Sequence, residues 1–138
     1  SRLDGLQAAV LGVKLNYLEE WTEQRIRLAD QYLAGLSQVP GLVLPKRADN
    51  VRQVYHLFVI RTDRRDELRT YLSDRDIQTG IHYPTALPKL AAYGYLNKGE
   101  ATGHAWTQDS TLLSLPIGEH LDSVAPVVEA VKDFFSRD

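Results

Sequence analysis

His82 and Tyr83 are the residues of this chain whose types and placement best suit ligand binding. They lie within the stretch from Ile77 to Tyr95, which reads IQTGIHYPTALPKLAAYGY. An imidazole and a phenol each offer a hydrogen bond together with an apolar face. The residues alone leave two interpretations open: a binding pair, or a structural histidine beside a packed tyrosine.

The residues before His82 predict a short strand, Ile77–Tyr83, that would position this pair. Ile77, Thr79 and Ile81 alternate with the residues between them, which is the period of a half-buried strand. Proline cannot donate to a strand ladder, so the strand should end before Pro84. His82 and Tyr83 are therefore expected where a rigid strand gives way to a loop, a frequent location for binding groups.

Composition excludes several classes of protein. The chain has 138 residues, a formal net charge of −2 and no cysteine. A nucleic-acid binder would carry a basic patch, and none is present, so no nucleic-acid partner is expected. No apolar run is long enough to span a bilayer, so no membrane partner is expected and a cytoplasmic location is the default. Without cysteine, and with histidines only at 56, 82, 104 and 120, no metal site is expected.

Hydrophobic periodicity predicts the other elements. Residues 1–36 have the three-to-four spacing of a long helix, with Ser1 and Asp4 as a capping box and a break near Lys14 to Asn16. After a loop over 37–50, residues 51–61 predict a strand in which Val54, His56, Phe58 and Ile60 share one face.

The second half of the chain continues the alternation of strands and helices. A helix capped by Thr62 or Asp63 should precede the Ile77–Tyr83 strand, and residues 85–110 should be irregular, with at most short helical turns. A third strand is expected around Leu112 to Leu115, and a final helix starts at Asp122 or Ser123. This order predicts an α/β (α+β) fold, a two-layer sandwich of a small, mainly antiparallel sheet with helices, preceded by the long N-terminal helix.

Four segments, in this order, carry a family resemblance: SRLDGLQAAVLGVKL, VYHLFVIRTDRRDELRTYL, TGIHYPTALPKLAAYGYL and LLSLPIGEHL. Together they resemble the C-terminal part of the DegT/DnrJ family of sugar aminotransferases, over nearly the whole chain. The resemblance implies a linking helix or helix pair over residues 1–36 and a small C-terminal domain over residues 37–138.

The resemblance also implies an activity. Such enzymes use pyridoxal phosphate to move an amino group from a donor such as glutamate to a nucleotide-linked sugar, and a homodimer is implied. The cofactor requires a lysine for its Schiff base and a phosphate cradle. None of the five lysines, at 14, 46, 89, 98 and 132, matches the family's lysine segment. We therefore expect a fragment without a catalytic residue of its own, with pyridoxal phosphate held only by the intact enzyme.

Individual residues acquire roles through the resemblance. His82 and Tyr83 match a His-Tyr-Pro triplet that approaches the sugar nucleotide, and Tyr93 matches an aromatic element of the substrate side. Arg2 follows the position of an asparagine that reaches the cofactor phosphate, and the resemblance implies that Arg2 is itself a cofactor-binding residue. His56 is expected to be structural, and His104 and His120 to lie on the surface.

Two alternatives stay open. The family also contains sugar dehydratases in which histidine replaces the lysine, a choice that this chain does not reveal. Departures from the family pattern, such as Gly5 in place of a glutamate and Pro88 with Ala91 in place of a His-Pro pair, leave the substrate subclass open. The second alternative is a stand-alone α/β binding or dimerisation module.

Overall fold

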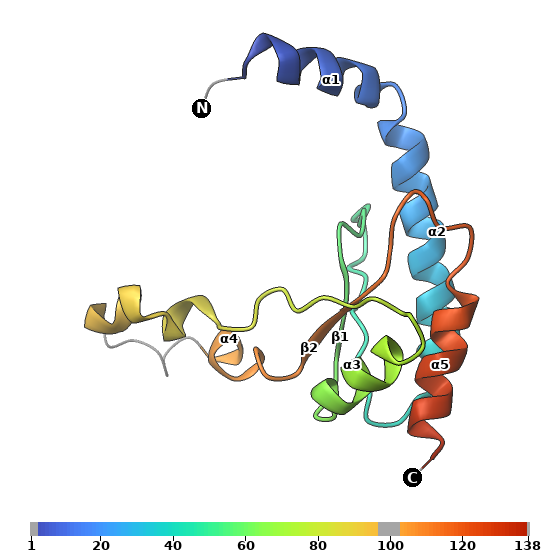
Figure 1. Ribbon diagram of the computed structural model, residues 1–138, viewed down its shortest axis with the longest axis vertical. Coiled ribbons are helices and arrows are strands. Elements are labelled where there is room, and N and C mark those ends of the chain that lie inside the picture. The colour runs from blue at the N-terminus through green and yellow to red at the C-terminus, as the bar shows by residue number, and fades with distance from the viewer. Residues whose placement is uncertain (1–2, 97–102, 138) are drawn as a thin grey trace.

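The computed structural model describes residues 3–96 and 103–137 (Figure 1). Its elements, in chain order, are α1 (Gly5–Leu15), α2 (Leu18–Leu36), β1 (Phe58–Arg61), α3 (Arg65–Ser73), the 3-10 helices η1 (Leu87–Lys89) and η2 (Ala91–Leu96), α4 (His104–Thr107), β2 (Leu112–Leu115) and α5 (Ala125–Phe135). The predicted loop over 37–50 agrees with this order, and the described parts of residues 85–110 contain only short helices, as predicted. No helix within the described ranges has the length and apolarity needed to cross a bilayer.

The sheet is small and antiparallel. β1 pairs with β2 so that Phe58 faces Leu115 and Arg61 faces Leu112. Isolated bridges extend both edges: Val43 pairs with Arg61 beside β1, and Gly80 pairs with Ser114 beside β2. Four chain segments therefore lie edge to edge, although only two of them form strands.

The predicted strand Ile77–Tyr83 is wrong as a strand, because only Gly80 of this segment pairs with the sheet. Asp76 has a φ of +58°, and the amide of Ile77 donates to the carbonyl of Leu72 at 3.0 Å. The start of the segment thus completes the end of α3 instead of running along β2. Alternation in the sequence could not distinguish one bridge from a full ladder.

The predicted strand over 51–61 is also too long, since β1 begins only at Phe58. Tyr55 has a φ of +50°, which interrupts the extended backbone and breaks the period of two. As a result Tyr55 is buried in the core, while His56, predicted to share a face with Phe58, is exposed.

The predicted N-terminal helix forms as two helices with the break close to where it was expected. α1 ends at Leu15 and α2 starts at Leu18, with Tyr17 stacked on Trp21 at 5.7 Å between ring centroids. The Asp4 side chain caps α1 by accepting a hydrogen bond from the amide of Gln7 at 2.8 Å. Ser1, the other half of the predicted capping box, lies outside the described residues.

The two later helices begin slightly after their predicted caps. α3 starts at Arg65 rather than directly after Thr62 or Asp63, and the Thr62 hydroxyl accepts from the amide of Arg64 just before it. α5 starts at Ala125, two residues beyond Ser123, with Pro126 in the first turn. Proline there removes only an amide that the helix leaves unpaired.

One hydrophobic core joins the sheet to α2, α3 and α5. Phe58 and Ile60 point from one face of β1 into this core, which confirms the two-layer arrangement. The ring of Tyr32 on α2 stacks on Phe58 at 4.6 Å, and its hydroxyl donates to the carbonyl of Pro116 at 2.8 Å. Burial raises the pKa of Tyr32 well above its usual value, so the hydroxyl stays a donor.

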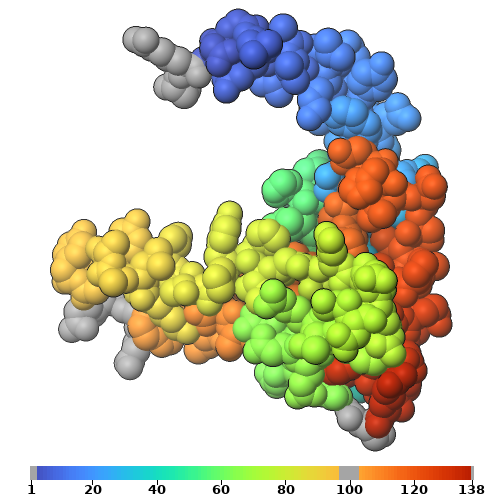
Figure 2. Space-filling model, viewed as in Figure 1, coloured from blue at the N-terminus to red at the C-terminus, as the bar shows by residue number. Residues whose placement is uncertain are grey.

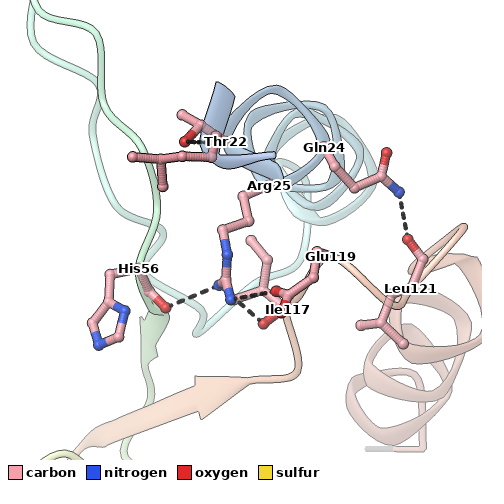
Figure 3. Close-up of polar contacts among 8 residues, drawn as sticks. Thr22, Gln24, Arg25, His56, Ile117, Glu119 and Leu121 are labelled. Atoms are coloured by element: carbon pink, nitrogen blue, oxygen red, sulfur yellow. Dashed lines mark hydrogen bonds and ion pairs between the residues drawn. The ribbon is translucent and has the colours of Figure 1, made fainter. Parts of the chain in front are cut away.

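Arg25 ties α2 to the segments at the ends of both strands (Figure 3). Its guanidinium donates to the carbonyls of His56 and Ile117 at 3.3 and 3.2 Å and pairs with the Glu119 carboxylate at 3.0 Å. Gln24, one residue earlier on α2, donates to the carbonyl of Leu121. We call the contacts of Arg25 the Arg25 clamp.

Two projections leave the packed body (Figures 1 and 2). One is α1, none of whose residues is buried. The other, here called the arm, comprises the described residues 84–96 and 103–110. Figure 2 shows open space between α1 and the arm even with all side chains drawn.

Candidate functional site

His82 lies two residues after the Gly80 bridge, at the edge of β2. Its Nδ1 is 2.9 Å from the hydroxyl of Ser114, the β2 residue that pairs with Gly80. The residue as a whole is exposed, whereas Ser114 is only 3% exposed. The imidazole is therefore anchored at one nitrogen and accessible elsewhere.

Gly80 gives the imidazole its place on the sheet edge. A side-chain Cβ at this position would lie 2.5 Å from Cε1 and 3.1 Å from Nδ1 of His82. Real Cβ contacts are essentially never as short as 2.5 Å, so the ring occupies the space that the missing side chain leaves. The Gly80 backbone pairs with Ser114 in both directions, at 3.0 and 2.7 Å.

Tyr83 is exposed over 74% of its surface and meets the His82 ring edge-on, with centroids 5.8 Å apart. It lies at the wall of an open, mainly apolar cavity of about 840 Å³. The cavity is bounded by the first residues of the arm, by the segment around α4 and by the start of β2: Tyr83, Pro84, Thr85, Ala86, Leu87, Pro88, Leu90, Ala105, Gln108, Asp109 and Leu112.

Asp109 is a buried carboxylate in this wall. It accepts hydrogen bonds from the Lys89 ammonium at 2.7 Å and from the amide of Ala86 at 3.1 Å. The contact with Lys89, followed by that with Ala86, holds the pKa of Asp109 below its usual value. The same ammonium lies 5.4 Å from the centroid of the Trp106 ring.

The structure brings His82 and Tyr83 together but places Tyr93 elsewhere. Tyr93 is in η2, further along the arm; it is 44% exposed and does not line the cavity. Arg2 lies outside the described residues. His56 contributes its carbonyl to the Arg25 clamp, and His104 and His120 are exposed, as predicted. No cluster of metal-ligating side chains occurs within residues 3–96 and 103–137.

Sequence reasoning missed Ser114, Gly80 and the Lys89–Asp109 pair. Ser114 is the one polar residue of the strand LLSL, a signal that its side chain needs a partner. Gly80 interrupts an otherwise apolar and β-branched alternation, which often marks a close approach. Nothing in the sequence links Lys89 to Asp109, because the two are 20 residues apart in an irregular region.

Comparison with known proteins agrees with this fold. The model of the DegT/DnrJ/EryC1/StrS aminotransferase family matches residues 1–132. The dTDP-3-amino-3,4,6-trideoxy-alpha-D-glucose transaminase of Streptomyces venezuelae is 42% identical over 99% of this chain. The dTDP-3-amino-3,6-dideoxy-alpha-D-galactopyranose transaminase of Aneurinibacillus thermoaerophilus is 38% identical over 97% of it.

A solved structure shows the same arrangement. The crystal structure of S. venezuelae DesV in complex with a ketimine intermediate superposes with a TM-score of 0.93 at 41% identity, over 99% of this chain and 38% of that one. The chain spans 37% of the length of each of the two curated relatives. The family match over residues 1–132 and these identities lead to one conclusion: the chain belongs to the DegT/DnrJ/EryC1/StrS aminotransferase family.

Proposed function

We propose that this chain is part of an enzyme that transfers an amino group from a donor such as glutamate to a keto sugar carried on a nucleotide. The chain supplies one wall of the active site. The observation that carries this proposal is the exposed His82–Tyr83 pair beside a large cavity, in a chain whose relatives are named as dTDP-amino-sugar transaminases.

Aminotransferases of this family depend on pyridoxal phosphate. When bound, this cofactor accepts and releases the amino group as an electron sink. The residues around the cavity do not fit the cofactor by themselves: Lys89 is committed to the Asp109 carboxylate, and the lining is mainly apolar rather than a phosphate cradle. We propose that the cofactor and its lysine belong to the rest of the protein.

We propose that His82 and Tyr83 bind the sugar nucleotide. His82 has one ring nitrogen on Ser114, which leaves Nε2 for a sugar or phosphate oxygen. The Tyr83 ring offers an apolar face and a hydroxyl donor to the same ligand. Their work in the reaction is to bind and orient the sugar, so neither is proposed to move a proton.

The organisation of the intact protein is part of the proposal. Residues 1–36 would link the body to the rest of the enzyme, with α2 also contributing to the core, and residues 37–138 would form the small domain. We further propose that the intact enzyme is a cytoplasmic homodimer. The exposed apolar residues along α1 offer a surface for packing against other parts of the enzyme.

The two half-reactions of the full-length protein test the proposal. Conversion of the cofactor to its amino form by glutamate should not depend on His82 or Tyr83. Amination of a dTDP-linked 3-keto sugar should lose about tenfold in efficiency in His82→Phe and Tyr83→Phe, because each loses a hydrogen bond to the sugar nucleotide. His120→Phe, an exposed histidine on another segment, is the matched control and should behave as wild type.

Three outcomes would contradict the proposal. Unchanged sugar kinetics in both variants would make the pair structural. Dehydration of the sugar without amine transfer would identify a dehydratase of the family. A full-length protein that binds no pyridoxal phosphate would favour a binding or dimerisation module.

A further inference from the structure

We propose that Ser114 and Gly80 are positioning residues that orient His82 toward the sugar nucleotide. The inference rests on the proposed function, because it assigns to these two residues the orientation of a side chain that we propose binds substrate. Neither residue would touch the sugar itself. Each acts on the imidazole from the sheet, one through a hydroxyl group and the other through the absence of a side chain.

Ser114 has little freedom to move. Its amide and carbonyl both pair with Gly80, at 2.7 and 3.0 Å, and β2 pairs with β1 on its other side, opposite Val59. The neighbouring Leu113 and Leu115 are buried. Oγ therefore projects from a backbone held on both edges, and its position is set by the sheet.

The hydroxyl proton of Ser114 needs an acceptor, because leaving a buried hydroxyl unpaired is costly. Across the described ranges the side chain of Ser114 has one hydrogen-bond partner, Nδ1 of His82. We therefore infer that the hydroxyl donates to Nδ1. The neutral imidazole then carries its proton on Nε2, which faces away from Ser114 and serves as the donor to a ligand oxygen.

Gly80 makes this orientation sterically available. Its φ lies outside the left-handed region, so the backbone would accept other residues. The restriction comes from the ring: a Cβ would fall 2.5 Å from Cε1, and the imidazole would have to swing away from Ser114. Because only the end of a side chain must move, the substitution should displace His82 without unfolding the protein.

A second Gly-x-His segment in the chain supplies a matched control. A Cβ at Gly118 would lie 2.6 Å from Cε1 and 2.8 Å from Nδ1 of His120, almost the same clash as at Gly80. His120 is exposed and has no proposed role. Gly118→Ala should therefore displace His120 much as Gly80→Ala displaces His82, without affecting the proposed site.

The test uses the full-length protein with its cofactor. Ser114→Ala and Gly80→Ala should each lower the efficiency of the sugar half-reaction about tenfold and leave the glutamate half-reaction within twofold. Ser114→Thr, which keeps the hydroxyl, should retain most of the wild-type efficiency in the sugar half-reaction. Gly118→Ala should have the same efficiency as the wild type. A Ser114→Ala protein that fails to fold leaves Gly80→Ala to carry the measurement.

Nitrogen-15 NMR of histidine-labelled protein gives a readout independent of activity. His82 should show a protonated Nε2 in the wild type and a mixture of tautomers in Ser114→Ala. A wild-type Nδ1–H tautomer, sugar kinetics unaffected in both variants, or equal losses in both half-reactions would overturn the proposal. If the wild type aminates no nucleotide sugar, the proposed function fails, while the NMR comparison still decides whether Ser114 orients His82.

Discussion

Asp109 holds the two ends of the arm together. It lies at the end of the arm that returns to β2, yet it accepts hydrogen bonds from Ala86 and Lys89, which lie at the end that leaves His82. A buried carboxylate with an ammonium partner and an amide donor is a stronger tether than an exposed ion pair, because solvent screens it less. Ala86 and Asp109 both line the cavity beside Tyr83, so their contact joins two parts of its wall.

The tether should respond to acid. The folded pKa of Asp109 is lowered, so its contribution to stability is complete above the unfolded pKa, near 3.9, and is lost as the pH falls through the folded value. In a Trp21→Phe background, Trp106 fluorescence should therefore change below about pH 4 while the helical signal of the body persists. Asp109→Asn should already show the altered emission at neutral pH. If Asp122→Asn, an exposed control, gave the same change, the tether would not be its cause.

At the residue level, the sequence indicated the exposed pair His82 and Tyr83 better than it indicated the residues that support them. His82 and Tyr83 stand out by type and by their place before Pro84. Ser114 and Gly80 support them through a contact between positions 32 residues apart. A pairing of that kind depends on how two edges meet in three dimensions, and single-sequence patterns carry no information about it.

The contact between α2 and α5 depends on Gly35, in the last turn of α2. A Cβ at Gly35 would lie 2.6 Å from Cγ1 and 3.2 Å from Cγ2 of Val128. Glycine normally costs a helix interior up to about 1 kcal/mol relative to alanine. Here the loss is offset because the missing side chain lets two core helices approach closely.

Gly35→Ala should consequently destabilise the protein, by about 1–3 kcal/mol, since the branched Val128 cannot turn both methyl groups away. Urea unfolding measures the change. Gly12→Ala in α1, where a Cβ meets nothing within 4 Å, should not lower the midpoint. The clash would be refuted if Gly35→Ala cost as much in a Val128→Ala background as in the wild type.

Helices were predicted more accurately than strands, for a physical reason. The apolar stripe of residues 1–36 repeats many times, and the break at Asn16 and Tyr17 lies close to its predicted place. Strand limits depend on partners elsewhere in the chain and on positive-φ residues such as Tyr55 and Asp76. A tyrosine rarely adopts a positive φ, so nothing in the residue type of Tyr55 predicted its turn.

At the scale of the molecule, α1 presents apolar side chains without cover from the body. Leu6 is 79% exposed and Val13 63%, and neighbouring residues of the same kind extend the patch: Leu3, Val10, Leu11 and Leu15. A patch of this kind on a small protein marks a surface for association. The chain spans about a third of the length of its relatives. We therefore propose that the rest of the enzyme packs against this patch.

Expressed alone, the chain should self-associate through α1. Sedimentation at several concentrations should show a rising mass for the wild type and a monomer for the double variant Leu6→Gln, Val10→Gln, because burial of this patch recovers roughly 25 cal/mol per Å². Val51→Gln, which alters an exposed apolar residue on a loop, should associate as the wild type does. A wild-type chain that stays monomeric at every concentration would show that the exposed apolar surface of α1 does not drive association.

The Arg25 clamp bears on the order of events during folding. Arg25 is 31 residues from His56 and 92 from Ile117, so its contacts require the ends of β1 and β2 to be in place already. Contacts that form late in folding affect the unfolding rate rather than the folding rate. Arg25→Met, which keeps much of the aliphatic stem, should speed unfolding several-fold and leave the refolding rate almost unchanged in stopped-flow measurements. That result would mean that the Arg25 clamp forms after the rest of the fold and slows unfolding.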